Sequence, residues 1–256
     1  VAARKWLKGD GGAAGSVSAG SPGAVLPGAL LRVGRIRGIS RPAVCPALPT
    51  AKGGKVLIID AGANAECKPV NLCHFALMGT AYARAMGVKE PRVGLVTNGT
   101  EEHKGDPLHQ ESYHLLKKLQ GIHFVGNVEG RDIMSGDIDV AVCDGFSGNI
   151  ALKAIEGCGK TVAEMLKKEF TASLPRKLSY LVAKKPISGL SNALDYSRFG
   201  GSVFLGLKKV VVKSHGSSKA KSIKPSIYQA IDACRGGLIG MMEDMLTKTS
   251  GQSEDA

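Results

Sequence analysis

The chain has 256 residues, of which 43% are hydrophobic and 5% aromatic, and its 34 Lys and Arg against 22 Asp and Glu give a formal charge of +12. This length and apolar content can bury a full core, while the charge points to an anionic partner such as nucleic acid, a membrane surface or an acidic protein. No apolar stretch approaches the roughly 20 residues that cross a bilayer, and we see no signal peptide, so we expect a soluble, cytoplasmic protein.

Strands and helices alternate along most of the chain. Strands are predicted at residues 55–60, 92–97, 122–125, 138–143 and 210–213, and helices at 69–86, 108–119, 150–170 and 227–246. Short β-branched runs separated by helices are typical of a parallel sheet covered on both faces, so we predict a doubly wound α/β fold. We expect residues 1–246 to form a single domain and residues 247–256 to form a flexible tail.

Candidate ligand-binding residues follow the first of these strands, at the sheet edge where open α/β proteins bind ligands. Gly62 and Asn64 come directly after the strand, and Lys68 stands just before the next helix. A glycine turn, an amide and a cation at a helix start can form a phosphate cradle. A tight turn with a solvated lysine is the alternative, and these residues taken alone favour it.

A charged loop follows the strand 92–97 and contains Lys104 beside Gly105. Such loops are usually solvated surface. A flexible ammonium group next to a glycine can also bind a phosphate or polarise a carbonyl oxygen.

Further candidates follow the strands 138–143 and 210–213. Gly145 permits a tight turn at a helix start, where free N–H groups can hold an anion. Asn149 is either the N-cap of that helix or an amide donor to an oxyanion. His215 is either part of a capped turn or a histidine at the ligand edge.

Two other patterns lead to exclusions. Residues 157–161 end like a nucleotide-binding loop, but Ala154 stands where that motif needs glycine and the segment lies inside a predicted helix, so we exclude ATP binding. The six cysteines contain no C-x-x-C pair, so we expect reduced thiols, no metal and no cofactor.

Residues 174–199 form a basic amphipathic segment, in which leucines and other apolar residues are interleaved with Arg176, Lys177, Lys184 and Lys185. Such a segment usually packs on a partner helix with its charges in water. A membrane surface or an acidic protein is the functional alternative.

Together these motifs resemble the phosphate acyltransferase family of bacterial phospholipid synthesis (PlsX). The resemblance runs along nearly the whole chain, and its segments are residues 18–20, 28–36, 38–43, 48–50, 62–64, 68–69, 91–95, 104–105, 126–129, 131–132, 144–146, 195–197, 200–201 and 213–218. So many motifs in the right order are highly specific.

The resemblance implies a three-layer α/β/α sandwich of the kind found in phosphotransacetylases and isopropylmalate dehydrogenases. It implies a homodimer without a cofactor that moves a long-chain acyl group from acyl carrier protein to inorganic phosphate. The acyl phosphate product would serve a membrane glycerol-3-phosphate acyltransferase, which implies peripheral association with the membrane. Carrier protein and the inner membrane surface are both anionic and suit the +12 charge.

The resemblance also assigns roles to residues of this chain. Lys104 is implied to bind phosphate or to polarise the carbonyl, and Asn149 to donate to phosphate or to the oxyanion. The residues implied to line the site are Gly62, Asn64, Lys68, Gly145 and His215.

The start of the chain departs from the family. We expect the family's opening strand and a phosphate-side loop, about 80 residues on the scale of domain sizes, to be missing. Pro22 replaces a residue whose N–H could face phosphate, and Pro27 should kink the helix that starts there.

The alternative functions are a phosphotransacetylase-type enzyme acting on acyl-CoA, or an inactive truncated scaffold that binds carrier protein or membrane. Nucleic-acid binding ranks last, because no recognisable module accompanies the charge.

Overall fold

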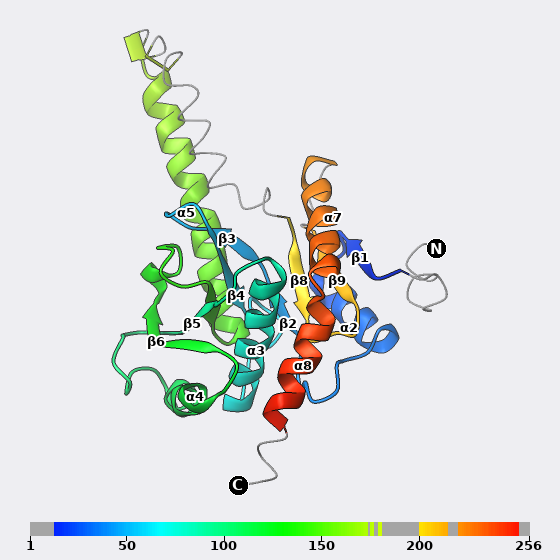
Figure 1. Cartoon of the computed structure of the whole chain (residues 1–256). Coiled ribbons are helices and arrows are strands. Elements are labelled where there is room, and N and C mark those ends of the chain that lie inside the picture. Colours follow the sequence, from blue (N-terminus) through cyan, green and yellow to red (C-terminus); the bar gives the residue numbers. More distant parts are fainter. Residues whose placement is uncertain (1–12, 174, 177–178, 181–199, 215–219, 251–256) are drawn as a thin grey trace.

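The structure is a computed structural model that describes residues 13–173, 175–176, 179–180, 200–214 and 220–250. Figure 1 shows its helices and strands. The strands are β1 (Gly15–Ser18), β2 (Ala43–Cys45), β3 (Ala47–Pro49), β4 (Lys55–Ile59), β5 (Arg92–Thr97), β6 (His123–Glu129), β7 (Val140–Val142), β8 (Ser202–Leu205) and β9 (Val210–Lys213). The helices are α2 (Pro22–Arg32), α3 (Pro69–Ala85), α4 (Pro107–Lys118), α5 (Gly145–Thr171), α7 (Ala220–Arg235) and α8 (Leu238–Ser250), with a short 3-10 turn at Gly130–Asp132.

The described strands form two sheets. The first has the order β3-β4-β7-β5-β6, in which β3 is antiparallel to β4 and the other neighbours are parallel. The second has the order β1-β9-β8-β2, in which only β1 and β9 are parallel. Pro46 joins β2 to β3, so one extended run passes from one sheet to the other. The two sheets are therefore linked through the main chain at this run.

Alternating side chains cover both faces of each sheet, as the predicted fold requires. In β4, Leu57 and Ile59 pack in the cluster that contains Phe75 of α3, whereas Val56 and Ile58 pack in the cluster that contains Leu152 of α5. In the second sheet, Val210 and Val212 of β9 belong to the α3 and α7 cluster, and Val211 belongs to the cluster of α2. Helices thus lie on both sides of the strands, which confirms the three-layer α/β/α architecture.

The strands predicted at 92–97 and 210–213 have those bounds in the structure. The short strands β2, β3 and β8 were not predicted. The prediction of one helix at 227–246 is wrong. The structure has two helices there, α7 and α8, which are separated by Gly236 and Gly237. Gly237 has a φ of +69°, which ends α7, and an added Cβ on Gly236 would lie 2.2 Å from the Ala85 carbonyl oxygen. α8 continues to Ser250, into the segment predicted as a tail.

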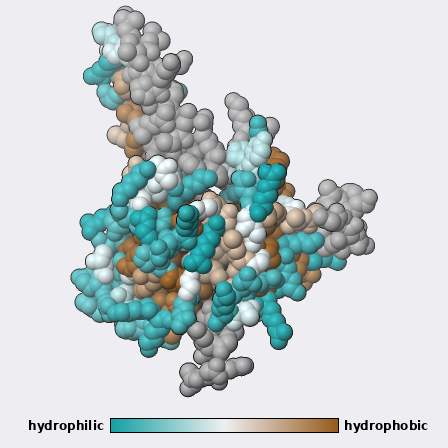
Figure 2. All heavy atoms as spheres, in the orientation of Figure 1, coloured by the Kyte–Doolittle hydropathy of each residue, from teal (hydrophilic) through white to brown (hydrophobic). Residues whose placement is uncertain are grey.

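The molecular surface is mixed in character. Figure 2 shows hydrophilic side chains over most of the visible face, with apolar side chains between them. The second half of α5 extends away from the two sheets (Figure 1). None of the helices in the described part of the chain combines the length and the apolar composition needed to cross a bilayer.

Candidate functional site

The turn after β4 is built around a buried carboxylate, Asp60. Its Oδ1 accepts the Val44 N–H at 2.8 Å and its Oδ2 accepts the Asn64 N–H at 2.6 Å, while the Ala63 N–H and the Asn64 side-chain amide also donate to it. Burial raises the pKa of the Asp60 carboxyl, and these hydrogen bonds act in the opposite direction. The carboxylate holds the residues of the turn, Gly62 among them, in one arrangement.

α5 begins directly against this turn. An added Cβ on Gly148 would lie 2.0 Å from the Asp60 carbonyl oxygen, and one on Gly145 would lie 2.6 Å from the Asn64 carbonyl oxygen. Only glycine permits this approach. The Oδ1 of Asp144 accepts the N–H groups of the second and third helical residues, both at 2.9 Å, so Asp144 is the N-cap.

The helix therefore starts earlier than the predicted residue 150, and the interpretation of Asn149 as its N-cap is wrong. Asn149 lies in the second turn of α5 and is exposed, and its side chain makes no hydrogen bond with a residue that the structure describes. Its side-chain Oδ1 lies 3.5 Å from the position of a Cβ on Gly62, whose φ is +124°. The structure thus brings Gly62 and Asn149 together, and the Asn149 amide has no partner among the described residues.

Asn64 and Gly145 lie in the same place but have their polar groups already bonded. Asn64 is 6% exposed, and its amide donates to the Pro42 carbonyl at 2.8 Å as well as to Asp60. The Gly145 N–H donates to the Asn64 carbonyl at 2.8 Å. These two residues form part of the wall of the site. The first N–H groups of α5 donate to Asn64 and Asp144.

Lys104 and Lys68 stand at the same carboxyl edge of the five-stranded sheet. Lys104 is half-buried in the loop after β5, the strand next to β7, and has no ion pair with a described residue. Several hydrogen bonds hold this loop, among them one from the Asn127 side chain to the Glu101 carbonyl at 2.7 Å and one from the Gly105 N–H to Asn98 at 3.0 Å. Lys68 is exposed and immediately precedes α3.

Two further lysines, Lys153 and Lys213, were not predicted as site residues. Lys153 is one helical turn beyond Asn149 along α5 and pairs with Glu156 at 2.7 Å. Lys213 ends β9 in the other sheet, and burial followed by the charge of Lys153 lowers its pKa. Lys213 is thus within electrostatic reach of Lys153 and also of Glu156, which acts in the opposite direction. Two ammonium groups in the neighbourhood of an amide suit an anion. Two sequence features could have indicated these lysines. Lys153 is four residues after Asn149, about one helical turn, and Lys213 is the first residue of the motif at 213–218.

Some predicted site residues lie outside the described part of the chain. His215 is one of these, and the preceding Ser214 is buried, with its hydroxyl donating to that of Ser226 at 2.6 Å. Of the basic segment, Arg176 is described and pairs with Glu169 at 2.7 Å. Lys177, Lys184 and Lys185 are not described.

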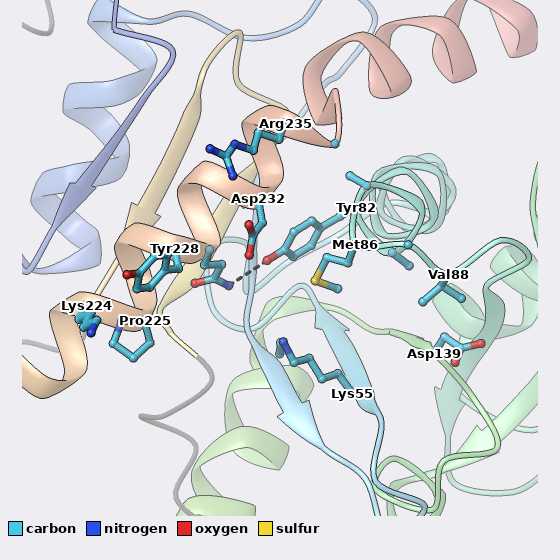
Figure 3. Close-up of a pocket in the computed structure, with 16 residues that line it drawn as sticks. Lys55, Tyr82, Met86, Val88, Asp139, Lys224, Pro225, Tyr228, Asp232 and Arg235 are labelled. Atoms are coloured by element: carbon cyan, nitrogen blue, oxygen red, sulfur yellow. Dashed lines mark hydrogen bonds between the residues drawn. The ribbon is translucent and has the colours of Figure 1, made fainter.

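A pocket of about 1120 Å³ lies at the opposite, amino-terminal edge of the five-stranded sheet (Figure 3). It is lined by Lys55 at the start of β4, by Met86 and Val88 after α3, and by Tyr228 and Arg235 of α7. On one wall the side-chain amide of Gln229 donates to the Tyr82 hydroxyl at 2.8 Å. This pocket is separated from Gly62 and Asn149 by the length of the strands, so we do not assign the chemistry to it.

The described residues contain no group of three or more side chains suited to hold a metal ion. The cysteines that the structure describes are free, and burial raises the pKa of the Cys67 and Cys73 thiols to about 11. Thiols of this kind stay protonated near neutral pH and are poor nucleophiles.

Comparison with known proteins gives a consistent result. A family model described as "Fatty acid synthesis protein" matches residues 5–241. Phosphate acyltransferase from Clostridioides difficile (strain 630) is 42% identical over 247 residues, which cover 96% of this chain and 72% of that protein. Phosphate acyltransferases from Clostridium perfringens (strain SM101) and Clostridium tetani are 46% and 45% identical, and each match covers 91% of this chain and 69% of the relative.

Solved structures with the same fold include two phosphotransacetylases. EutD phosphotransacetylase from Staphylococcus aureus superimposes with a TM-score of 0.57 at 16% identity, and a phosphotransacetylase from Streptococcus pyogenes with a TM-score of 0.59 at 19% identity. Each match covers 91% of this chain, which spans 66% of the length of those proteins. At such identities the likeness shows the fold, and it agrees with the predicted phosphotransacetylase-like sandwich.

Proposed function

The chain belongs to the phosphate acyltransferase family, and from that premise we propose that it moves a long-chain acyl group from acyl carrier protein to inorganic phosphate. The observation that carries the proposal is the approach of Asn149 to Gly62 at the carboxyl edge of the five-stranded sheet, with Lys153 one helical turn further along α5 and Lys213 of the other sheet within electrostatic reach of Lys153. This place offers an amide donor and two lysines, one of which is paired with Glu156. It fits a reaction whose nucleophile is already an anion and needs no strong base.

The proposed reaction is a single acyl transfer. A phosphate oxygen attacks the carbonyl carbon of the thioester, and the carbonyl oxygen becomes an oxyanion in the tetrahedral intermediate. The carbon–sulfur bond then breaks and the thiolate leaves. The proton that hydrogen phosphate gives up passes through water to the thiolate, so that acyl phosphate and the free carrier thiol are the products. Phosphate needs no strong base, so the protein mainly desolvates it, orients it and stabilises the oxyanion.

The proposed roles rest on the placement of the described side chains and, for His215, on its position in the sequence. The Asn149 amide donates to the oxyanion, because it is exposed and carries no bond to a described residue. Lys153, Lys213 and Lys104 bind or stabilise the anionic groups, and Lys68 adds charge at the rim. Gly62 leaves room above Asn149 for the reacting atoms, and His215 follows the strand that carries Lys213.

The partners proposed with this activity are acyl carrier protein, a second copy of the chain and an anionic membrane surface, where a glycerol-3-phosphate acyltransferase would use the product. The +12 charge supports the two acidic partners. On the extended part of α5, Met165 is 63% exposed and Val162 is 38% exposed, which supports a protein contact there.

If α5 carries the contact between two copies, Met165→Lys should shift sedimentation toward the monomer, whereas Lys167→Ala on the same helix should not.

The direct test is an assay for acyl phosphate with the purified chain, inorganic phosphate, and palmitoyl-carrier protein or palmitoyl-CoA as separate donors. We expect turnover with the carrier-protein donor to exceed turnover with the CoA donor. A preference for CoA would favour the phosphotransacetylase-type alternative. Binding of carrier protein without any acyl phosphate would favour the scaffold.

A further inference from the structure

A pocket of about 630 Å³ lies beside the turn after β4. Three leucines of α2 form one side of it, and residues of the turn and of the segment after α2 form the other, including Arg41, Ala63 and Asn64. Ala63 is the neighbour of Gly62, whose Cβ position lies 3.5 Å from the Asn149 side chain. The pocket is therefore next to the place where the thioester carbonyl lies in the proposed reaction.

The side formed by α2 is apolar. Leu26 and Leu30 are four residues apart on the helix and pack partly against the core, while Leu31 is 84% exposed. A single exposed leucine needs no explanation, but this one borders a pocket that two other leucines line. The volume falls in the range of small-molecule sites, which are mostly apolar with a few polar groups that fix the orientation of the ligand.

One cation at this pocket is available to an anion. The Arg35 guanidinium donates to the Ser40 carbonyl, so it is already held by the protein. Arg41 is exposed and makes no hydrogen bond or ion pair with a residue in the described ranges. A planar guanidinium is well suited to bind phosphoryl oxygens through two parallel N–H groups.

We propose that this pocket is the acyl-chain subsite of the enzyme. Leu26, Leu30 and Leu31 contact the hydrocarbon chain, and Arg41 contacts the phosphoryl oxygens of the acyl phosphate beside Ala63. The inference rests on the proposed function, and it adds that α2 sets the preference for chain length. The ligand class is an amphiphile with an alkyl chain and a phosphate-like head group.

Binding of stable analogues tests this inference without turnover. We would measure the Kd of dodecylphosphonate and of butylphosphonate by calorimetry for the full chain and for Leu31→Asn. Leu31 is exposed, so the substitution leaves folding intact, and Leu115→Asn on α4, where the leucine is 41% exposed, is the matched control. We expect Leu31→Asn to weaken dodecylphosphonate binding about tenfold, through lost apolar contact, and to leave butylphosphonate within about twofold. We expect no change for Leu115→Asn.

Arg41→Gln tests the polar end of the pocket, with Arg37→Gln as its control because Arg37 is exposed on the same segment and does not line the pocket. Arg41→Gln should weaken both phosphonates by a similar factor, and Arg37→Gln should weaken neither.

Failure to bind dodecylphosphonate, or equal losses for both probes in Leu31→Asn, would overturn the acyl-chain assignment. Unchanged binding in Arg41→Gln would overturn the role of Arg41. Chain-dependent binding without acyl transfer from either donor would refute the proposed function alone, whereas acyl transfer with chain-independent binding would refute this inference alone.

Discussion

Asn149→Ala separates a catalytic role from a structural one, because the structure predicts opposite effects on rate and stability. Asn149 is an exposed residue in the second turn of α5, and the cap of that helix is Asp144. Alanine has the higher helix propensity, so the substitution should raise the free energy of unfolding by about 0.5 kcal/mol or leave it unchanged. Removal of one oxyanion donor costs about 2.7–4 kcal/mol of transition-state stabilisation, which is roughly a 100- to 1,000-fold loss of kcat.

The assay pairs steady-state formation of acyl phosphate with urea unfolding of the same preparations. Thr161→Ala is the matched control, since Thr161 is exposed on α5 about 18 Å further along the helix and also gains helix propensity. Asn149→Asp tests the donor itself, because it keeps the size of the side chain but removes the N–H groups, and it should be at least as slow as the alanine variant. A rate within threefold of the unsubstituted protein for Asn149→Ala would refute the assignment of Asn149 to the oxyanion.

Three further outcomes are expected. Lys104→Ala should abolish most turnover with little change in the urea midpoint, because the side chain is a loop cation outside the core, and an unchanged rate would remove it from the site. Gly148→Ala should destabilise the protein by about 1–3 kcal/mol, since its Cβ would lie 2.0 Å from a carbonyl oxygen of the turn after β4, whereas Gly157→Ala on the same helix has open space and should not. Asp139→Asn should cost about 1–2 kcal/mol at pH 7, because the neutral amide loses the charge and one of the two oxygens that accept from the Arg92 guanidinium. Burial alone would raise the pKa of Asp139, but the hydrogen bonds from Arg92 outweigh it and lower that pKa in the folded protein. The stabilisation by Asp139 is therefore complete above the unfolded-state pKa near 4 and is lost as the pH falls through the lower folded-state pKa. The difference in unfolding free energy between the unsubstituted protein and Asp139→Asn should shrink below about pH 4.

The long elements could be predicted from the sequence because their signals are local. The apolar runs of β4, β5 and β9 and the start of α3 at Pro69 depend on a few neighbouring residues, and their bounds follow the pattern closely. The strand β2 has only three residues, and its pairing with β8 joins positions about 160 residues apart, which no local pattern contains.

The start of α5 shows why the site was harder to predict than the fold. Asp144 and Asn149 are both good N-cap residues, and the sequence alone does not choose between them. The choice is made by packing, because Gly145 and Gly148 allow the helix to approach the turn held by Asp60, and a start at residue 150 would give up that contact. The role of Asp60 is equally invisible in the sequence, since its donors include the N–H of Val44, which belongs to a distant strand.

The position of the cations depends on how the two sheets are joined. Asn149 and Lys153 belong to a helix that packs on the five-stranded sheet, whereas Lys213 ends a strand of the four-stranded sheet. The run through β2 and β3 pairs with both sheets, and its Val44 N–H is bonded to the same Asp60 that shapes the turn beside Asn149. One buried carboxylate therefore fixes the turn and ties it to the strand that links the sheets. In the proposed reaction, orientation of phosphate and thioester would supply much of the rate, so we expect the same link to serve the chemistry as well as the fold.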